Sequence, residues 1–125
     1  MPPKRSITLT QAELRLMKIL WERGESAVSD MVTATAAETE LAYNSVLTTV
    51  RVLEDKGYVK HVKDGRAHVY MPLVGRKEAT RFEIRHLVNR FFKSSEEALV
   101  LNILEDSEID SDELTRLRQL LQEHK

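Results

Sequence analysis

The stretch from residue 41 to residue 74, LAYNSVLTTVRVLEDKGYVKHVKDGRAHVYMPLV, decides the fold. Val46, Val50 and Leu53 recur within it at intervals of four and three residues, which places them on one face of a helix. This spacing predicts a helix from residue 43 to residue 56 whose apolar face is buried. Gly57 follows and supplies the left-handed position that commonly ends a helix.

The other face of this predicted helix is polar. Tyr43, Asn44, Ser45 and Thr48 carry hydrogen-bonding groups, and Arg51 adds a planar cation. Such side chains can read the edges of base pairs in the major groove of DNA. The alternative is an ordinary solvent-facing side of a helix, which residues of this kind form more often when nothing else accompanies them.

A β-hairpin is predicted directly after the helix. Residues 58–63 form a run rich in β-formers, Asp64-Gly65 is a turn signal, and residues 67–71 return until Pro72. A helix with a polar face followed by such a hairpin is typical of a winged helix-turn-helix.

The hairpin is basic. From Lys56 to Arg66 there are four cations against the single acid Asp64, and we expect Lys60, Lys63 and Arg66 to contact DNA phosphates. The alternative is that lysines at an exposed hairpin serve solubility and protect the strand edge. The neighbouring polar helix favours the phosphate contacts.

Two helices are predicted upstream. Thr10 and Glu13 have the spacing of a capping box, which begins a helix that runs to about residue 23 and stops at Gly24. Ser26 is a candidate N-cap for a second helix that ends near Glu38. A short link then leads to the helix at residue 43, as in a helix-turn-helix.

Three further helices are predicted after Gly75, at residues 76–92, at residues 95–105 and beginning after Ser111. We expect residues 1–74 to form the winged DNA-binding domain and residues 75–125 a helical dimerisation domain. Three helices in about fifty residues cannot bury a core of their own size, which favours a two-fold homodimer. The apolar residues predicted to meet the second copy are Leu87, Phe91, Leu101, Leu104, Leu117 and Leu121.

Composition excludes several classes of protein. The chain of 125 residues has no cysteine, so it has no disulfide framework and no thiolate metal site. A net charge of -1 argues against a generic nucleic-acid binder and requires local positive charge for DNA contact. No apolar run reaches membrane-spanning length, so we expect a cytoplasmic protein that does not insert into a membrane.

No catalytic or cofactor motif is present in the sequence. His61 and His68 could face one another across the hairpin and bind a metal, but surface histidines on a wing are far commoner. The sequence therefore predicts neither an enzyme nor a metal or cofactor site.

Several stretches spread along the chain match a known family. They are Leu9-Thr10-Gln11-Ala12-Glu13, Met17, Leu20, Trp21, residues 42–53, Lys56-Gly57, Lys63-Asp64-Gly65-Arg66, Tyr70 and Pro72-Leu73-Val74. Through them the chain resembles the BlaI/MecI-type repressors of penicillinase and methicillin resistance over nearly its whole length. The resemblance implies a winged-helix dimer that represses transcription by occupying an operator and that takes part in antibiotic resistance.

The resemblance also implies a switch. Residues 98–102 look like the segment that family members present to a membrane-bound sensor metalloprotease, with the bond from Asn102 to Ile103 as the candidate cut. Ile103 departs from the phenylalanine of the best-known relatives. The absence of cysteine excludes the cysteine-rich copper site that several relatives carry.

Two other functions remain open at this point. A winged-helix module used for association with proteins would bind DNA weakly and without sequence preference. A regulator that responds to a small molecule would have a ligand pocket between its winged domain and its dimer helices.

Overall fold

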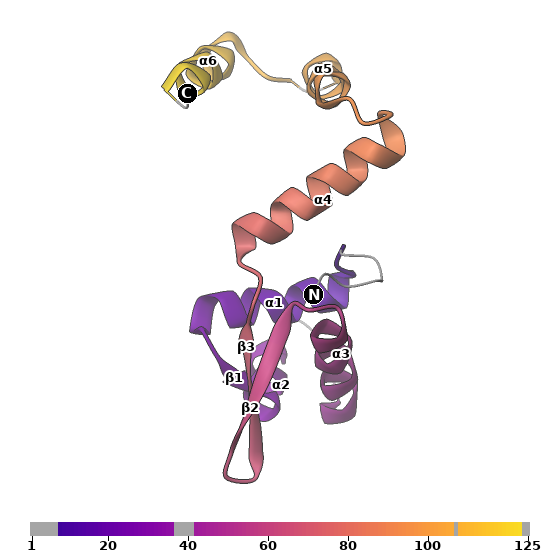
Figure 1. Ribbon diagram of the computed structural model, residues 1–125. Helices are drawn as coiled ribbons and strands as arrows, with labels where there is room; N and C mark the ends of the chain where they lie inside the picture. Colours follow the sequence, from indigo (N-terminus) through magenta and orange to yellow (C-terminus); the bar gives the residue numbers. More distant parts are fainter. Residues whose placement is uncertain (1–7, 37–41, 107, 124–125) are drawn as a thin grey trace. The chain divides into compact units, whose positions relative to one another are not determined.

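The computed structural model describes residues 8–36, 42–106 and 108–123, and the chain divides into two compact units. The first unit ends at His86 and the second begins at Leu87. The mainly helical fold with a small β-hairpin wing, predicted from the sequence, is confirmed (Figure 1). The elements up to the boundary are α1 (Gln11–Arg23), β1 (Ser26–Ala27), α2 (Val28–Thr35), α3 (Tyr43–Asp55), β2 (Val59–Asp64), β3 (Ala67–Pro72) and the first part of α4 (Arg76–Phe91).

The predicted capping box begins α1. The Thr10 hydroxyl accepts a hydrogen bond from the Glu13 backbone N–H at 3.2 Å, and Glu13 Oε1 accepts one from the Thr10 N–H at 2.8 Å. Gly24 ends the helix with a φ of 84°, and its N–H donates to the Leu20 carbonyl at 2.7 Å. Both ends of α1 therefore follow from local sequence.

The start of α2 differs from the prediction. Ser26 does not cap the helix, because Ser26 and Ala27 form the short strand β1, in which Ser26 pairs with Tyr70 of β3. Ala27 is the N-cap, without a side-chain hydrogen bond. A strand of two residues is too short to show an alternating pattern, so only the distant partner strand reveals it. As described, α2 ends at Thr35, and the predicted end near Glu38 lies outside the described residues.

The predicted helix and hairpin are both present. Beyond α3, Gly57 has a φ of 86°, and the Tyr58 N–H donates to the Leu53 carbonyl at 2.9 Å. Asp64 pairs with Ala67, so the hairpin loop is Gly65-Arg66, one residue later than the predicted turn. Gly65 has a φ of 64°, as the first position of a type II′ turn requires.

The core of the first unit is built from the predicted apolar faces. The sheet, in the order β1-β3-β2, packs with α1, α2, α3 and the start of α4 around it. Val46, Val50 and Leu53 of α3 are fully buried, as predicted from their spacing. The other buried members are Leu16, Met17, Leu20, Val28, Met31, Tyr58, Val59, Tyr70 and Ala79.

A buried ion pair joins two helices of this unit. Lys56 Nζ is 2.7 Å from Glu13 Oε1, and it also donates to the Thr8 carbonyl at 3.1 Å. Both side chains are almost fully buried. Because a buried charge is tolerated only when it is paired and hydrogen-bonded, this pair fixes the end of α3 against the start of α1.

The second unit contains the end of α4, α5 (Glu96–Asp106) and α6 (Ser111–Glu123). Ser95 caps α5 through its hydroxyl, which accepts from the Ala98 N–H at 3.1 Å. Asp110 caps α6, with Oδ1 accepting from the Glu113 N–H at 2.8 Å. No described residue of α5 or α6 is buried, so these helices form no core within a single chain.

The division after His86 differs from the domain limit expected at Gly75. Ala79 and Phe82 of α4 pack against the core of the first unit, so the start of this helix belongs there. The limits of the two functional domains stay a prediction.

The Glu13–Lys56 pair yields a prediction about stability. Replacing Lys56 with Met removes one partner and leaves a buried carboxylate unpaired, which should destabilise the fold by about 3 to 5 kcal/mol. Urea unfolding at fixed protein concentration measures this change. The matched control is Lys18→Met, because Lys18 is exposed on α1 and its loss should change the free energy of unfolding by less than about 0.5 kcal/mol. Equal stability of the two variants would refute the structural role of the pair.

Candidate nucleic-acid interface

The polar face of α3 is open to solvent. Asn44, Ser45, Thr48 and Arg51 are exposed, and Tyr43 keeps half of its surface accessible. Because the opposite face of the helix is buried in the core, the structure brings all five predicted residues of α3 to one surface. A helix exposed in this way can enter a major groove.

Hydrogen bonds within α3 set what Thr48 can offer. Its hydroxyl donates to the Asn44 carbonyl at 2.8 Å, and Thr49 makes the same bond to Ser45 at 2.9 Å. With its proton engaged, the Thr48 oxygen is available as an acceptor and its methyl group as an apolar contact. An acceptor suits the amino groups of adenine and cytosine, and a methyl group suits thymine.

A hollow of about 250 Å³ lies between α3, the start of α2 and the hairpin. Tyr43 and Arg51 line it from α3, and Arg66 lines it from the hairpin loop. Two of the predicted cations thus converge from elements that are separate in sequence. Such a cationic concavity suits a phosphate of the DNA backbone.

Other residues of this hollow were not predicted from the sequence. Ser29, Leu47 and His68 also line it. Their presence depends on how α2 and β3 pack beside α3, and their residue types carry no distinguishing signal. Only Leu47, on the helix face next to Arg51, could have been suspected from the helical period.

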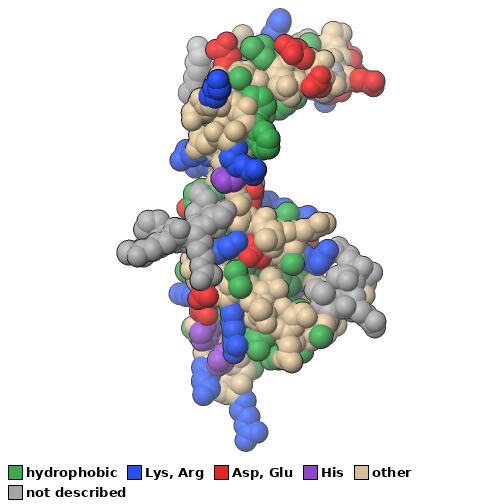
Figure 2. Space-filling view, turned by 90° about the vertical axis from the view of Figure 1, so that its right-hand side faces the viewer, with side chains coloured by type: hydrophobic (Ala, Val, Ile, Leu, Met, Phe, Trp, Pro, Cys, Tyr) green, Lys and Arg blue, Asp and Glu red, His purple; other side chains and the backbone are tan. Residues whose placement is uncertain are grey.

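The two lysines predicted to contact DNA lie on different faces of the hairpin. Lys63 is paired with His68, whereas Lys60 is paired with Met71. Because side chains alternate between the faces of a strand, Lys60 and Lys63 lie on opposite faces of the hairpin. Figure 2 shows Lys and Arg side chains at the end of the hairpin, with histidine side chains next to them.

A side-chain contact attaches the hairpin to α3. His61 Nδ1 lies 2.7 Å from Glu54 Oε2, and the His61 ring stacks on that of His68 with centroids 4.7 Å apart. Burial raises the pKa of the neighbouring Tyr70 and Glu54 raises it further, while Arg51 opposes the shift.

Among the described residues, no group of three or more His, Asp or Glu side chains is arranged to hold a metal ion.

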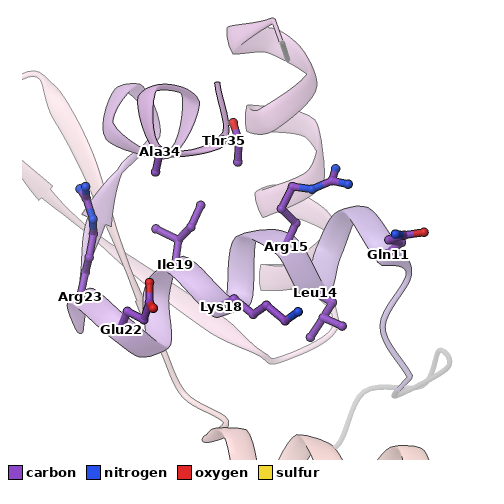
Figure 3. A pocket seen from close by; sticks show the side chains of 9 residues that line it. All are labelled: Gln11, Leu14, Arg15, Lys18, Ile19, Glu22, Arg23, Ala34 and Thr35. Atoms are coloured by element: carbon purple, nitrogen blue, oxygen red, sulfur yellow. The ribbon is translucent and has the colours of Figure 1, made fainter. Parts of the chain in front are cut away.

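A second cavity, of about 410 Å³, lies between α1 and the end of α2 (Figure 3). Arg15, Lys18, Glu22 and Arg23 of α1 line it, so charges of both signs surround it. The hydroxyl of Thr35 at its edge already donates to the Met31 carbonyl at 3.0 Å. Its walls come from α1 and α2, so it is not the pocket beside the dimer helices that a small-molecule regulator was expected to have.

Comparison with known proteins decides the family. The family model described as penicillinase repressor matches residues 9–123. The chain belongs to this family. The resemblance predicted from the sequence is confirmed, and the members of the penicillinase repressor family are transcriptional regulators rather than enzymes. In the described part of the chain, no helix is long and apolar enough to cross a membrane.

Similar relatives cover most of the chain. The penicillinase repressor of Bacillus licheniformis is 27% identical over 122 residues, which are 98% of this chain and 95% of the relative. The transcriptional regulator BlaI of Mycobacterium tuberculosis is 32% identical over 117 residues, which are 92% of this chain and 83% of the relative.

The solution structure of the DNA-binding domain of the repressor BlaI has a similar fold. The TM-score is 0.53 at 24% identity, and the match covers 60% of this chain and 92% of that one. The winged-helix fold of the first unit is thereby shown.

Proposed function

We propose that this member of the penicillinase repressor family is a sequence-specific transcriptional repressor that binds a dyad-symmetric DNA operator as a homodimer. The observation that carries the proposal is the exposed polar face of α3 beside the hollow that Arg51 and Arg66 line. The relatives support it, since one is named penicillinase repressor and another methicillin resistance regulatory protein MecI. A further solved structure shows monomeric BlaI of Bacillus licheniformis bound to the blaP half-operator, with a TM-score of 0.50 at 23% identity, covering 59% of this chain and 90% of that one.

The residues divide by role in this proposal. Asn44, Ser45 and Thr48 read base edges because they are short and exposed on the helix that enters the groove. Arg51 and Arg66 hold a phosphate at the hollow, and Lys63 at the hairpin end extends the contact along the backbone. Tyr43 lines the same hollow, and Lys60, on the opposite face of the hairpin from Lys63, is a further phosphate contact.

The exposed apolar residues of the second unit support the homodimer. Phe91 and Leu121 are 65% and 72% exposed in the single chain, and Leu101 is 49% exposed. Leaving such side chains in water forgoes about 1.5 to 3 kcal/mol each. A second copy of the chain would cover them, and Leu87, Leu104 and Leu117 would join the same interface.

We further propose that repression is relieved by cleavage between Asn102 and Ile103 by a membrane-bound sensor metalloprotease. Both residues lie in α5 and are exposed in the single chain. A cut there separates α6 and the end of α5 from the winged unit. The cut removes three of the six side chains that we assign to the dimer interface, Leu104, Leu117 and Leu121, so the α3 helices of the two copies would lose their connection.

The reading role of α3 predicts a loss of specificity. Replacing Asn44 or Thr48 with Ala should reduce the preference for the operator over scrambled duplexes, because each lost base contact costs about 1 to 3 kcal/mol. The operator is first selected from random duplexes, and affinities are then measured by fluorescence anisotropy. The matched control is Thr33→Ala, an exposed threonine of α2 outside the hollow. Unchanged preference in both α3 variants would show that α3 does not read the operator.

The phosphate role of the hairpin predicts a different signature. The double variant with Lys63 and Arg66 replaced by Ala should bind all sequences more weakly, because backbone contacts carry no sequence information. Its slope of log affinity against log salt should flatten by about 0.9 for each lost contact. The variant with Lys18 and Arg23 replaced by Ala removes the same charge from α1 and should keep the slope. A slope that is unchanged in the hairpin variant would exclude these contacts.

The switch is tested with a chain that ends after Asn102. This chain should be monomeric in sedimentation and should bind the operator about 10² to 10⁴ times more weakly, because the second half-site is no longer tethered. Its affinity for an isolated half-site should stay the same.

A full-length control separates dimer loss from truncation. Replacing Leu117 and Leu121 with Glu should also give a monomer with intact half-site binding, whereas Gln119→Glu should leave the dimer intact. A truncated chain that still dimerises and holds the operator as tightly as the full chain would rule out this mechanism of release.

A further inference from the structure

Residues 8 and 9, which lie just before α1, are hydrogen-bonded both to α4 and to the end of α3. The backbone N–H of Leu9 donates to Glu83 Oε1 of α4 at 2.6 Å, across 74 residues of sequence. The neighbouring carbonyl of Thr8 accepts from Lys56 Nζ at 3.1 Å. Two adjacent residues are therefore bonded to α4 on one side and to the C-cap of α3 on the other.

The other contacts of Lys56 make this connection rigid. Its ammonium group is also paired with Glu13 at 2.7 Å, and Glu13 accepts from the Thr10 N–H at 2.8 Å. Thr10 directly follows Leu9, so the chain from Thr8 to Glu13 is held at both of its ends. A movement of α4 relative to α3 must break one of these partly or fully buried bonds.

Apolar packing supports the same arrangement. Phe82, next to Glu83, packs against the core and presents a ring edge to Tyr58, with centroids 6.4 Å apart and planes at 82°. Burial raises the pKa of Tyr58 to about 12, and the charges of Glu83 and Glu13 act in the same direction. The side chain of Glu83 is thus half-buried against the winged unit, within one turn of the end of this unit at His86.

The direction of α4 matters for a dimer that binds two half-sites. From Ala79, where α4 is buried in the core, to His86, where the winged unit ends, the helix rises about 10 Å at about 1.5 Å per residue. A tilt of about 20° at Ala79 displaces His86 by about 3.5 Å, close to the ~3.4 Å between successive base pairs. Such a tilt therefore changes the half-site spacing that a dimer fits.

We propose that Glu83 is a positioning residue for operator recognition: its bond to Leu9 fixes the direction in which residues 76–86 of α4 leave the winged unit and so sets the half-site spacing that the dimer accepts. The inference rests on the proposed dimeric repressor. Glu83 lies on α4, away from the polar face of α3 and from the hairpin. It acts through the backbone of residues 8–10, just before α1.

The test uses the full chain and a series of duplexes. Each duplex carries the two selected half-sites with the central spacing changed by up to two base pairs in either direction, and one duplex carries a single half-site. The wild-type chain should lose about tenfold or more in affinity when the spacing changes by one base pair, because the tether no longer spans both sites. Glu83→Ala should lose at most about threefold, since its α4 can tilt.

Matched variants distinguish positioning from charge and from folding. Glu83→Gln keeps an oxygen that accepts from the Leu9 N–H, so it should retain the wild-type spacing profile. Glu78→Ala removes an equal charge from an exposed position of α4 and should also retain it. Leu9→Pro deletes the donor instead of the acceptor and should relax the profile as Glu83→Ala does. All variants should bind the single half-site with equal affinity.

The outcomes separate the two proposals. If the wild-type chain prefers the correctly spaced duplex and both Glu83→Ala and Leu9→Pro keep that preference unchanged, the positioning role is overturned while the repressor remains. If the wild-type chain binds the dyad no better than scrambled DNA, the proposed function fails and the positioning role falls with it.

Discussion

The buried ion pair between Lys56 and Glu13 is the constraint on which the winged unit depends. Two charges removed from water stabilise the fold only in a geometry that satisfies both, and here the Thr8 carbonyl and the capping box of α1 complete the set. An apolar contact could slide by a fraction of an ångström at little cost. The ion pair holds the end of α3 in one position against α1. It therefore fixes the direction in which the polar face of α3 points.

The interface follows from that direction. With its apolar side buried, α3 presents its hydrogen-bonding side chains to solvent, and the hairpin begins only a few residues beyond Lys56. The contact between Glu54 and His61 attaches the hairpin to the same helix, and Arg66 of the hairpin loop lines the same hollow as Arg51. The surface proposed to contact DNA is thus built on α3 and the hairpin, and its cations come from both: Arg51 from the helix and Arg66 from the hairpin loop.

The two units differ in how complete they are. The winged unit closes a core from α1, α2, α3, the sheet and the start of α4, so it has the packing of a domain that folds alone. The second unit leaves α5 and α6 without a described buried residue. Its apolar faces need a partner, which is the physical reason that a second copy belongs to the proposed function.

Local sequence by itself determined most of the helices and strands, and it determined the α3 part of the proposed DNA-binding surface. The capping box at Thr10, the glycines that end α1 and α3, the buried stripe of α3 and its exposed polar face all follow from period and capping. Tertiary structure alone decided β1, the convergence of Arg51 with Arg66 and the bonds of Lys56 and Glu83. These depend on contacts between residues that lie far apart in the chain, and neither helical period nor strand alternation encodes which distant residue meets which.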